Sequence, residues 1–158
     1  MRKVLLASLV ICMLALLSTL SMSVHATPPT TAYGRWTYIP TFTKRMADGN
    51  EFRYGEEVST WTGDFAGDSD DVFTVVIHPS GFRNVKGLIS FVGSVNGKSG
   101  TMVISFVGEG TPPPVTWSGH WVILSGTDGL ENLRGQGTWW GPPTNVEYLG
   151  QIHFDPAA

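Results

Sequence analysis

Short runs of β-forming residues, separated by Gly, Pro, Asn and Asp, recur along the chain from residue 33 onward and limit what it can fold into. All 19 Gly, all 10 Pro, and every Trp, Tyr and Phe lie after Ala26. No stretch keeps the period of an amphipathic helix over a useful length, so a helical bundle is excluded. We expect about eight strands, at residues 33–39, 51–65, 72–78, 85–93, 101–108, 115–124, 135–140 and 146–154.

The clearest hairpin joins the strands at residues 85–93 and 101–108 through a loop from Asn96 to Gly100. A single domain at residues 33–155 made of such antiparallel neighbours forms either a sandwich or a barrel. Closure removes the sheet edges that an exported β protein would otherwise expose. We therefore expect an all-β fold, a single antiparallel barrel of about eight strands, whose interior is packed solid or holds one small ligand.

The first 26 residues have the pattern of a secretory signal peptide. Arg2 and Lys3 precede a nearly continuous apolar run at residues 4–20, and the small residue Ala26 fits a signal-peptidase site. Cleavage after Ala26 leaves a linker at residues 27–32 and predicts a secreted, periplasmic or cell-envelope protein with no membrane segment. The apolar run also approaches the length of a short membrane span, so an uncleaved anchor is the competing interpretation.

Cysteine content and charge exclude several classes of function. Cys12, the only cysteine, lies in the apolar run, so the cleaved chain has no thiol for disulfides, metal ligation or nucleophilic catalysis. The chain has 10 Lys and Arg against 13 Asp and Glu, and loss of Arg2 and Lys3 makes it more acidic. This charge argues against nucleic acid as a partner, because phosphate binding needs a basic face.

The alternation of side chains along each strand indicates which residues could line a lumen. The candidate ligand-binding residues are Trp61, Met102, Phe106, Trp117, Trp121 and Tyr148. The alternation does not show which face points inward where both faces of a strand are apolar. Trp139 and Trp140 are adjacent on one strand, so at most one of them lines the lumen.

No nucleotide or metal motif is present. The glycine-rich stretch at residues 126–137 lacks the GxGxxG spacing and precedes a strand rather than a helix. His78, His120 and His153 are far apart in the sequence, and no HxH or HExxH spacing occurs. We therefore predict no metal and no cofactor.

The acidic stretch Asp68, Asp70 and Asp71 suggests calcium at first sight, but it lacks the Gly and Glu that an EF-hand loop requires. We expect an acidic hairpin loop there instead.

Catalytic constellations are also missing. There is no G-x-S-x-G elbow for a nucleophilic serine. Acid–base chemistry could involve Glu109, Glu57 or Asp64, since an aromatic-lined barrel can raise the pKa of a carboxyl group by desolvation. The sequence does not choose among these three.

Three segments carry a family resemblance: TGDFAG at residues 62–67, GKSGTMV at 97–103, and above all SGTDGLENLRGQG at 125–137. They resemble the bacterial family named domain of unknown function 3224, whose members are similar to the allene oxide cyclase barrel and to calycin-like barrels. The last segment has Asp128 and Asn132 where the family usually has Gly, and these residue types also tolerate a left-handed backbone. The resemblance implies an eight-stranded calycin-like barrel that forms homo-oligomers, and it carries over no catalytic residue.

Three functions follow as hypotheses. The first is an exported barrel that binds a small hydrophobic or aromatic molecule without chemistry, which a cavity with no perturbed carboxyl or His would favour. The second is a cofactor-free cyclase or isomerase of the allene oxide cyclase type, which a buried Glu, His or Tyr facing open lumen would favour. The third is a solid barrel with an envelope or assembly role, which a filled lumen would favour.

Overall fold

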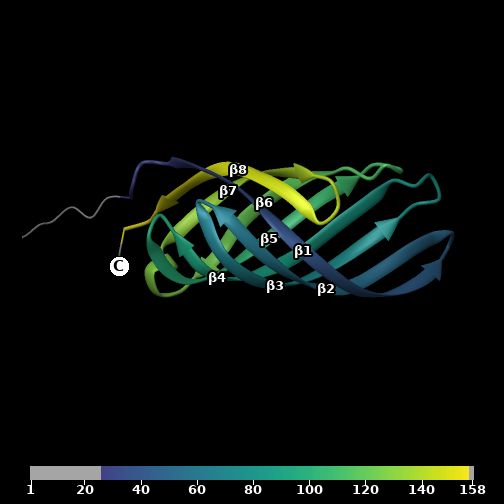
Figure 1. The fold of residues 1–158 in the computed structure, drawn as a ribbon, viewed down its shortest axis with the longest axis horizontal. Coiled ribbons are helices and arrows are strands. Elements are labelled where there is room, and N and C mark those ends of the chain that lie inside the picture. The colour runs from purple at the N-terminus through teal and green to yellow at the C-terminus, as the bar shows by residue number, and fades with distance from the viewer. Residues whose placement is uncertain (1–25, 157–158) are drawn as a thin grey trace, which may run out of the picture.

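The computed structural model describes residues 26–156, which form one closed antiparallel β-barrel in which each strand pairs with the next and β8 returns to β1 (Figure 1). The strands are β1 (Thr30–Ala47), β2 (Asn50–Gly63), β3 (Phe65–Ile77), β4 (Arg83–Val95), β5 (Lys98–Gly110), β6 (Trp117–Gly126), β7 (Leu133–Gly141) and β8 (Asn145–Phe154). The eight-stranded barrel expected from the sequence is confirmed. Apart from Ala26, the predicted signal peptide lies outside the described residues.

A single 3-10 turn, η1 (Asp128–Leu130), links β6 to β7, and its Leu130 is fully buried at one end of the lumen. Within residues 26–156 no helix is long and apolar enough to cross a membrane.

The turn between β2 and β3 comes earlier than the sequence predicted. It is formed by Gly63, whose φ is +108°, and by Asp64, whose Oδ2 accepts a hydrogen bond from the backbone N–H of Tyr33 at 2.7 Å. β3 therefore begins at Phe65, whereas the sequence predicted Phe65 at the end of the preceding strand.

The acidic stretch consequently lies inside β3, and the predicted acidic hairpin loop was wrong. Its carboxylates are accommodated by hydroxyl groups on β2, because Thr60 Oγ1 donates to Asp68 Oδ1 at 3.0 Å and Ser59 Oγ donates to Asp71 Oδ2 at 2.7 Å. Asp68 and Asp70 face solvent, whereas Asp71 points into the barrel and is 1% exposed. An inward carboxyl group of this kind bears directly on the chemistry of the lumen.

β1 is much longer than the predicted strand and continues through Pro40 to Ala47. Its pairing with β8 ends at Thr37, and Tyr38 N makes a last contact on that side, donating to Thr144 O at 3.3 Å. The backbone nitrogen of Pro40 faces the same side, beyond any partner, so its missing N–H costs no ladder bond. At the other end, residues 30–32 pair with β8 although the sequence suggested a linker there.

Two hairpin turns have the expected residues in left-handed conformations. Asp48 and Gly49 connect β1 to β2 with φ values of 51° and 77°, and Asn96 and Gly97 connect β4 to β5 with 51° and 76°. The second turn is tighter than the predicted loop from Asn96 to Gly100, because the strand resumes at Lys98. Positive φ at both central residues matches the twist of the flanking strands.

One half of the lumen is filled by aromatic side chains. Trp36 stacks on Trp61 with ring centroids 4.5 Å apart, and Phe65 stacks on Tyr148 at 4.9 Å. The backbone N–H of Phe65 also donates to the Tyr148 hydroxyl at 2.8 Å. We call this half, together with η1, the packed end.

Large rings fit in the packed end because the facing strands contribute glycine. Trp121 lies against Gly137 on β7 and Gly150 on β8, where an added Cβ would overlap its indole ring. Its Nε1 donates to the backbone carbonyl of Thr138 at 3.1 Å, which fixes the indole in place.

We expect Gly150→Ala to lower the free energy of unfolding by about 1–3 kcal/mol, because the new methyl group and Trp121 cannot share the same space. Urea denaturation measures the change. Gly97→Asn is the matched control, since that turn has open space and Asn tolerates its positive φ. Equal stability of the Gly150→Ala variant and the wild type would show that Trp121 can move aside without cost.

Candidate functional site

The end of the barrel opposite η1 contains a cavity of about 200 Å³. Apolar side chains make up most of its wall, and four of its residues are ionisable. The lining residues are Trp36, Tyr38, Pro40, Phe42, Arg53, Glu57, Phe73, Val75, Arg83, Val85, Phe106, Val115, Trp117, Trp139, Pro143, Thr144 and Val146. We call this half of the lumen the open end.

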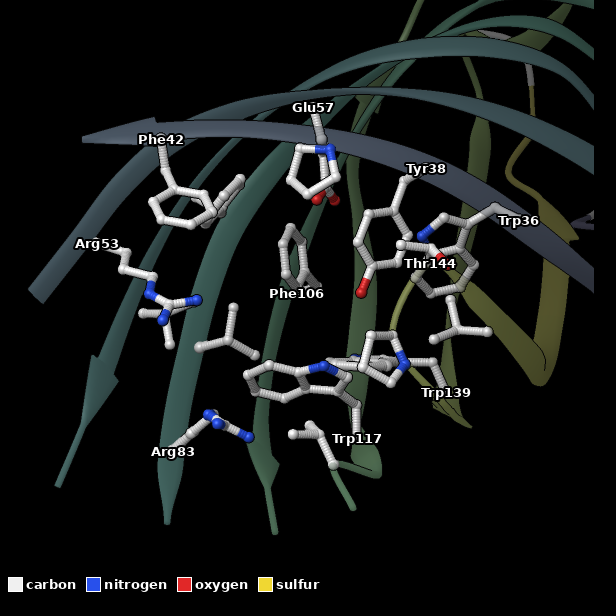
Figure 2. A pocket seen from close by; sticks show the side chains of 17 residues that line it. Trp36, Tyr38, Phe42, Arg53, Glu57, Arg83, Phe106, Trp117, Trp139 and Thr144 are labelled. Carbon is white, nitrogen blue, oxygen red and sulfur yellow. The ribbon is translucent and has the colours of Figure 1, made fainter. Parts of the chain in front are cut away.

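The open end stays hollow because the strands no longer surround it completely. β1 loses its β8 neighbour after Thr37, while the β1–β2 hairpin continues for ten more residues of β1, to Ala47. Figure 2 shows the rings of Tyr38, Phe106 and Trp117 around a central space rather than stacked through it. The aromatic residues here form walls, whereas those at the packed end form a core.

Glu57 on β2 and Asp71 on β3 are direct cross-strand partners, and both lie on the inward face of the sheet. Glu57 lines the cavity, and Figure 2 shows its carboxyl group pointing into it. Asp71 lies behind the wall, where Ser59 Oγ donates to its Oδ2 at 2.7 Å. Asp71 Oδ1 has no hydrogen-bond partner among the described residues. The lumen therefore contains two adjacent carboxyl groups, of which one reaches the cavity.

Both carboxyl groups favour their neutral forms. Burial raises the pKa of Glu57 to about 8, and the negative charge of Asp71 adds to the effect. Burial also raises the pKa of Asp71 to about 6, although hydrogen bonds from Ser59 and Ser69 oppose the shift. The two groups titrate as a coupled pair, and the hydrogen bonds place their shared proton: Ser59 donates to Asp71 and stabilises its ionised form, whereas no described side chain donates to Glu57.

Tyr38 and Thr144 provide hydroxyl groups in the cavity, and Tyr38 lies near Glu57 on the neighbouring strand (Figure 2). Burial raises the pKa of Tyr38, the backbone of Thr144 lowers it, and the charge of Glu57 raises it further. The phenol is therefore a neutral hydrogen-bond donor over the whole physiological range.

Two half-buried arginines lie at the rim of the cavity. Arg53 on β2 donates to Glu51 Oε1 at 2.6 Å and its guanidinium lies over the Phe42 ring at 4.6 Å from the centroid. Arg83 on β4 donates to the carbonyl of Thr111 at 3.2 Å. Both occupy inward-facing positions of their strands, and Glu51 balances the charge of Arg53, so Arg83 contributes the net positive charge beside the opening.

The structure separates the predicted ligand-binding residues into two groups. Phe106 and Trp117 line the cavity, but Trp61, Met102, Trp121 and Tyr148 are at most 4% exposed and belong to the aromatic and aliphatic core. All six share the inward face of the barrel. Alternation along a strand identifies that face, but it does not show how far along the lumen the side chains meet.

The cavity also contains residues that the sequence analysis did not select, namely Trp36, Tyr38, Phe73 and Trp139. Trp139 is 4% exposed and its neighbour Trp140 is on the outer surface, as the alternation required. Of the three acid–base candidates, only Glu57 faces the cavity. Glu109 is on the outer face and Asp64 is in the β2–β3 turn.

The structure does not bring His78, His120 and His153 together as metal ligands. His78 contacts Asn50 Oδ1 at 3.0 Å and Asn84 Oδ1 at 2.7 Å, and His120 is on the outer surface. Among residues 26–156 no cluster of three or more His, Cys, Asp or Glu side chains could hold a metal ion.

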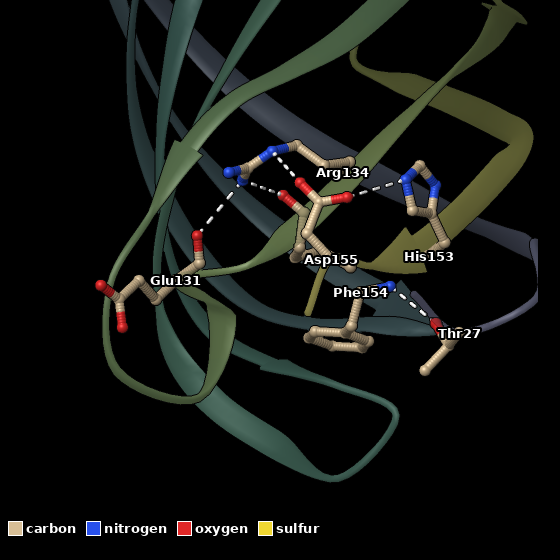
Figure 3. Close-up of polar contacts among 7 residues, drawn as sticks. Thr27, Glu131, Arg134, His153, Phe154 and Asp155 are labelled. Atoms are coloured by element: carbon tan, nitrogen blue, oxygen red, sulfur yellow. Dashed lines mark hydrogen bonds and ion pairs between the residues drawn. The ribbon is translucent and has the colours of Figure 1, made fainter. Parts of the chain in front are cut away.

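His153 belongs to a cluster at the packed end (Figure 3). Asp155 accepts from Arg134 Nε at 2.9 Å and contacts His153 Nε2 at 3.3 Å. Beside it, the backbone N–H of Phe154 donates to Thr27 Oγ1 at 2.7 Å. These contacts tie the C-terminal end of the described chain to β7 and its N-terminal end to β8.

These features define a class: a closed eight-stranded antiparallel barrel with one packed end and one aromatic cavity. The chain belongs to the family described as "Protein of unknown function (DUF3224)", whose sequence pattern matches residues 38–142. The family resemblance inferred from the three sequence segments is therefore confirmed.

A solved structure has the same fold. It is the crystal structure of a protein with unknown function from the DUF3224 family of Shewanella oneidensis MR-1, which matches with a TM-score of 0.68 and 18% sequence identity. The alignment covers 82% of this chain and 100% of that one. A search of curated proteins gave no match.

We expect the free energy of unfolding to decrease as the pH rises from about 4 to about 8, because both lumenal carboxyl groups have folded-state pKa values above their ordinary ones. A raised pKa stabilises the fold while the group is protonated, and this contribution is lost between the ordinary pKa and about 6 for Asp71, and between the ordinary pKa and about 8 for Glu57. Thermal unfolding across this range measures the change. Glu57→Gln should remove the part of the decrease that lies between about pH 6 and about pH 8, and an unchanged profile would contradict the assignment.

Proposed function

We propose that this protein is an exported carrier that binds a small hydrophobic or aromatic molecule in the cavity at the open end of its barrel. The observation that supports it is the cavity itself, whose wall has seven aromatic side chains and only a few polar groups. Ligand sites are typically concave and apolar, with a small number of polar groups that orient the ligand. The export part of the proposal rests on the sequence pattern of residues 1–26.

The aromatic walls favour binding over simple packing. At the packed end, rings such as Phe65 and Tyr148 are in van der Waals contact and leave no space. At the open end, Tyr38, Phe106 and Trp117 line a cavity of about 200 Å³ instead of filling it. A ligand ring inserted there would remove apolar surface of both the ligand and the protein from water, and the free energy of this burial is favourable by about 25 cal/mol per Å².

We expect saturable binding of aromatic, terpenoid or fatty-acyl probes, measured by the change in tryptophan emission on titration. Trp117→Ala removes one wall of the cavity and should weaken binding about tenfold, a value typical for loss of a large apolar contact. Trp140→Ala is the matched control, because that indole is on the outer face. A flat titration across all three probe classes, or equal losses in both variants, would count against a lumenal carrier.

A second candidate function, a cofactor-free isomerase of the cyclase type, is favoured by Glu57, because the sequence-based hypotheses associate a perturbed carboxyl group in the lumen with an enzyme and its absence with a carrier. Its carboxyl group faces the cavity with a raised pKa, and the Tyr38 hydroxyl is a hydrogen-bond donor in the same space. Ionised Glu57 could take a proton from a carbon beside a carbonyl group, while Tyr38 stabilises the enolate oxygen. Return of the proton from Glu57 to a different carbon completes a double-bond shift and leaves the enzyme unchanged.

This candidate predicts that 3-cyclohexen-1-one, incubated with the protein in D₂O, is converted to 2-cyclohexen-1-one, with deuterium in the product to the extent that the proton on Glu57 exchanges with solvent before its return. Proton NMR follows the loss of 3-cyclohexen-1-one and the formation of 2-cyclohexen-1-one. The rate should rise as Glu57 ionises near its pKa of about 8 and should fall to the buffer rate in Glu57→Gln. Conversion no faster than in buffer would leave the carrier as the function.

A further inference from the structure

The side chain of Glu57 is poorly satisfied for a group at this depth. It is half-buried in the cavity wall, and its raised pKa has no contribution from a hydrogen bond, only from burial and from the charge of Asp71. A carboxyl group that keeps its proton has an O–H donor, and a donor without a partner in an apolar wall is costly. Tyr38 and Pro40 on β1 provide no carboxylate, and Asp71, the neighbouring carboxyl group on β3, affects Glu57 through its charge and not through a hydrogen bond.

Asp71 holds the negative charge in a fixed position next to Glu57. Ser59 on β2 donates to its Oδ2, and Ser69 on β3 also hydrogen-bonds to it. Ser69 Oγ itself accepts from Trp61 Nε1 at 2.8 Å, so this network is attached to the aromatic core of the packed end. Asp71 is therefore immobile and closed off from the cavity, whereas Glu57 is exposed to it.

The other charged and titratable groups around the cavity are few. Arg53 lies on the same strand as Glu57 and is ion-paired with Glu51, and Arg83 approaches from β4. Tyr38 faces the cavity from β1 and Asp71 stands behind the wall on β3. The cavity residues supplied by β5 to β8 and their connections carry no charge.

We infer that the molecule bound in the cavity carries a neutral oxygen, as in a ketone, ester or ether, which accepts a hydrogen bond from the Glu57 carboxyl group. This inference rests on the proposed function and specifies the ligand chemistry of the same site. A protonated carboxyl donates one strong hydrogen bond, and the ligand oxygen gives the O–H the partner that the protein lacks.

A neutral oxygen fits the charges of the site better than a cationic group does. At the rim the charge of Arg53 is balanced by its ion pair with Glu51, and Arg83 would repel an incoming ammonium. Asp71 is separated from the cavity, so it cannot pair directly with a bound cation. A neutral acceptor needs no charge compensation and leaves the proton on Glu57.

Two probes of nearly equal size and apolar area test the inference: 2-acetylnaphthalene, which has a carbonyl oxygen, and 2-ethylnaphthalene, which has none. We expect the ketone to bind about tenfold more tightly at pH 6, since one hydrogen bond to an otherwise unpaired donor gives a difference of this order. The preference should disappear above about pH 8, where Glu57 ionises. Tryptophan emission of the mature protein reports both affinities.

Three variants separate the role of Glu57 from a general effect of pH. Glu57→Gln keeps an N–H donor without an ionisable group, so the preference for the ketone should persist and no longer depend on pH. Asp71→Asn removes the neighbouring charge, so the loss of preference should move to lower pH. Glu109→Gln is the control, because that carboxylate lies on the outer face, and it should match the wild type.

Equal affinity for the two probes at pH 6 would overturn the inference while leaving the carrier function intact. The inference would also fail if the preference for the ketone were unchanged from about pH 6 to about pH 9 in the wild type. Failure of both probes to bind at any pH would instead count against the proposed function. Thermal unfolding of each variant, measured beforehand, restricts the comparison to folded proteins, and Glu57→Gln alone suffices if Asp71→Asn does not fold.

Discussion

The interior of this barrel depends on the fit between large aromatic rings and glycines on the neighbouring strands. Trp121 lies against Gly137 and Gly150, and Tyr148 occupies the space that a side chain at Gly34 would fill. A lumen of eight strands is narrow, so rings of this size fit only where an adjacent strand contributes no side chain. The same fit recurs at the cavity, where Trp139 lies against Gly108 and Phe106 against Gly87, so glycines accommodate the rings along the whole lumen.

The same interior connects the core to the candidate site through a short polar network. Trp61 packs among the rings of the packed end and donates to Ser69, which hydrogen-bonds to Asp71, and Asp71 lies beside Glu57. Buried carboxyl groups lower stability unless they are paired or neutralised, and an apolar pair of similar volume would suit the fold better. Departures from stable packing of this kind concentrate at functional sites, and here the departure lies at the wall of the cavity.

Strand number, closure and the inward face could be predicted from the sequence because alternation and turn residues are local signals. The turn at Asp48 and Gly49 and the outward position of Trp140 illustrate this. The role of Asp71 could not be predicted in this way. In the sequence it belongs to an acidic run that resembles a loop, and only the register with β2, which brings Ser59 and Glu57 beside it, makes that run part of a strand.

The division of the aromatic residues into core and cavity could not be predicted from the sequence either. Trp61 and Trp117 both point inward by the alternation along their strands, but they lie at different depths in the lumen. Depth depends on how far each strand is shifted along its neighbour, a property of the closed sheet as a whole. Where β8 stops pairing with β1, at Thr37, decides which rings meet one another and which face open space.

Both ends of the described chain leave the barrel from its packed end, where Thr27 is hydrogen-bonded to Phe154 (Figure 1). The cavity opens at the opposite pole, between the β1–β2 hairpin and the start of β6. The two ends of the barrel therefore have different roles when the protein is attached to something else: the termini leave from one end and the cavity opens at the other. A surface, a fusion partner or an affinity matrix joined through either terminus would hold the barrel by its solid base and present the opening outward, accessible to molecules in solution.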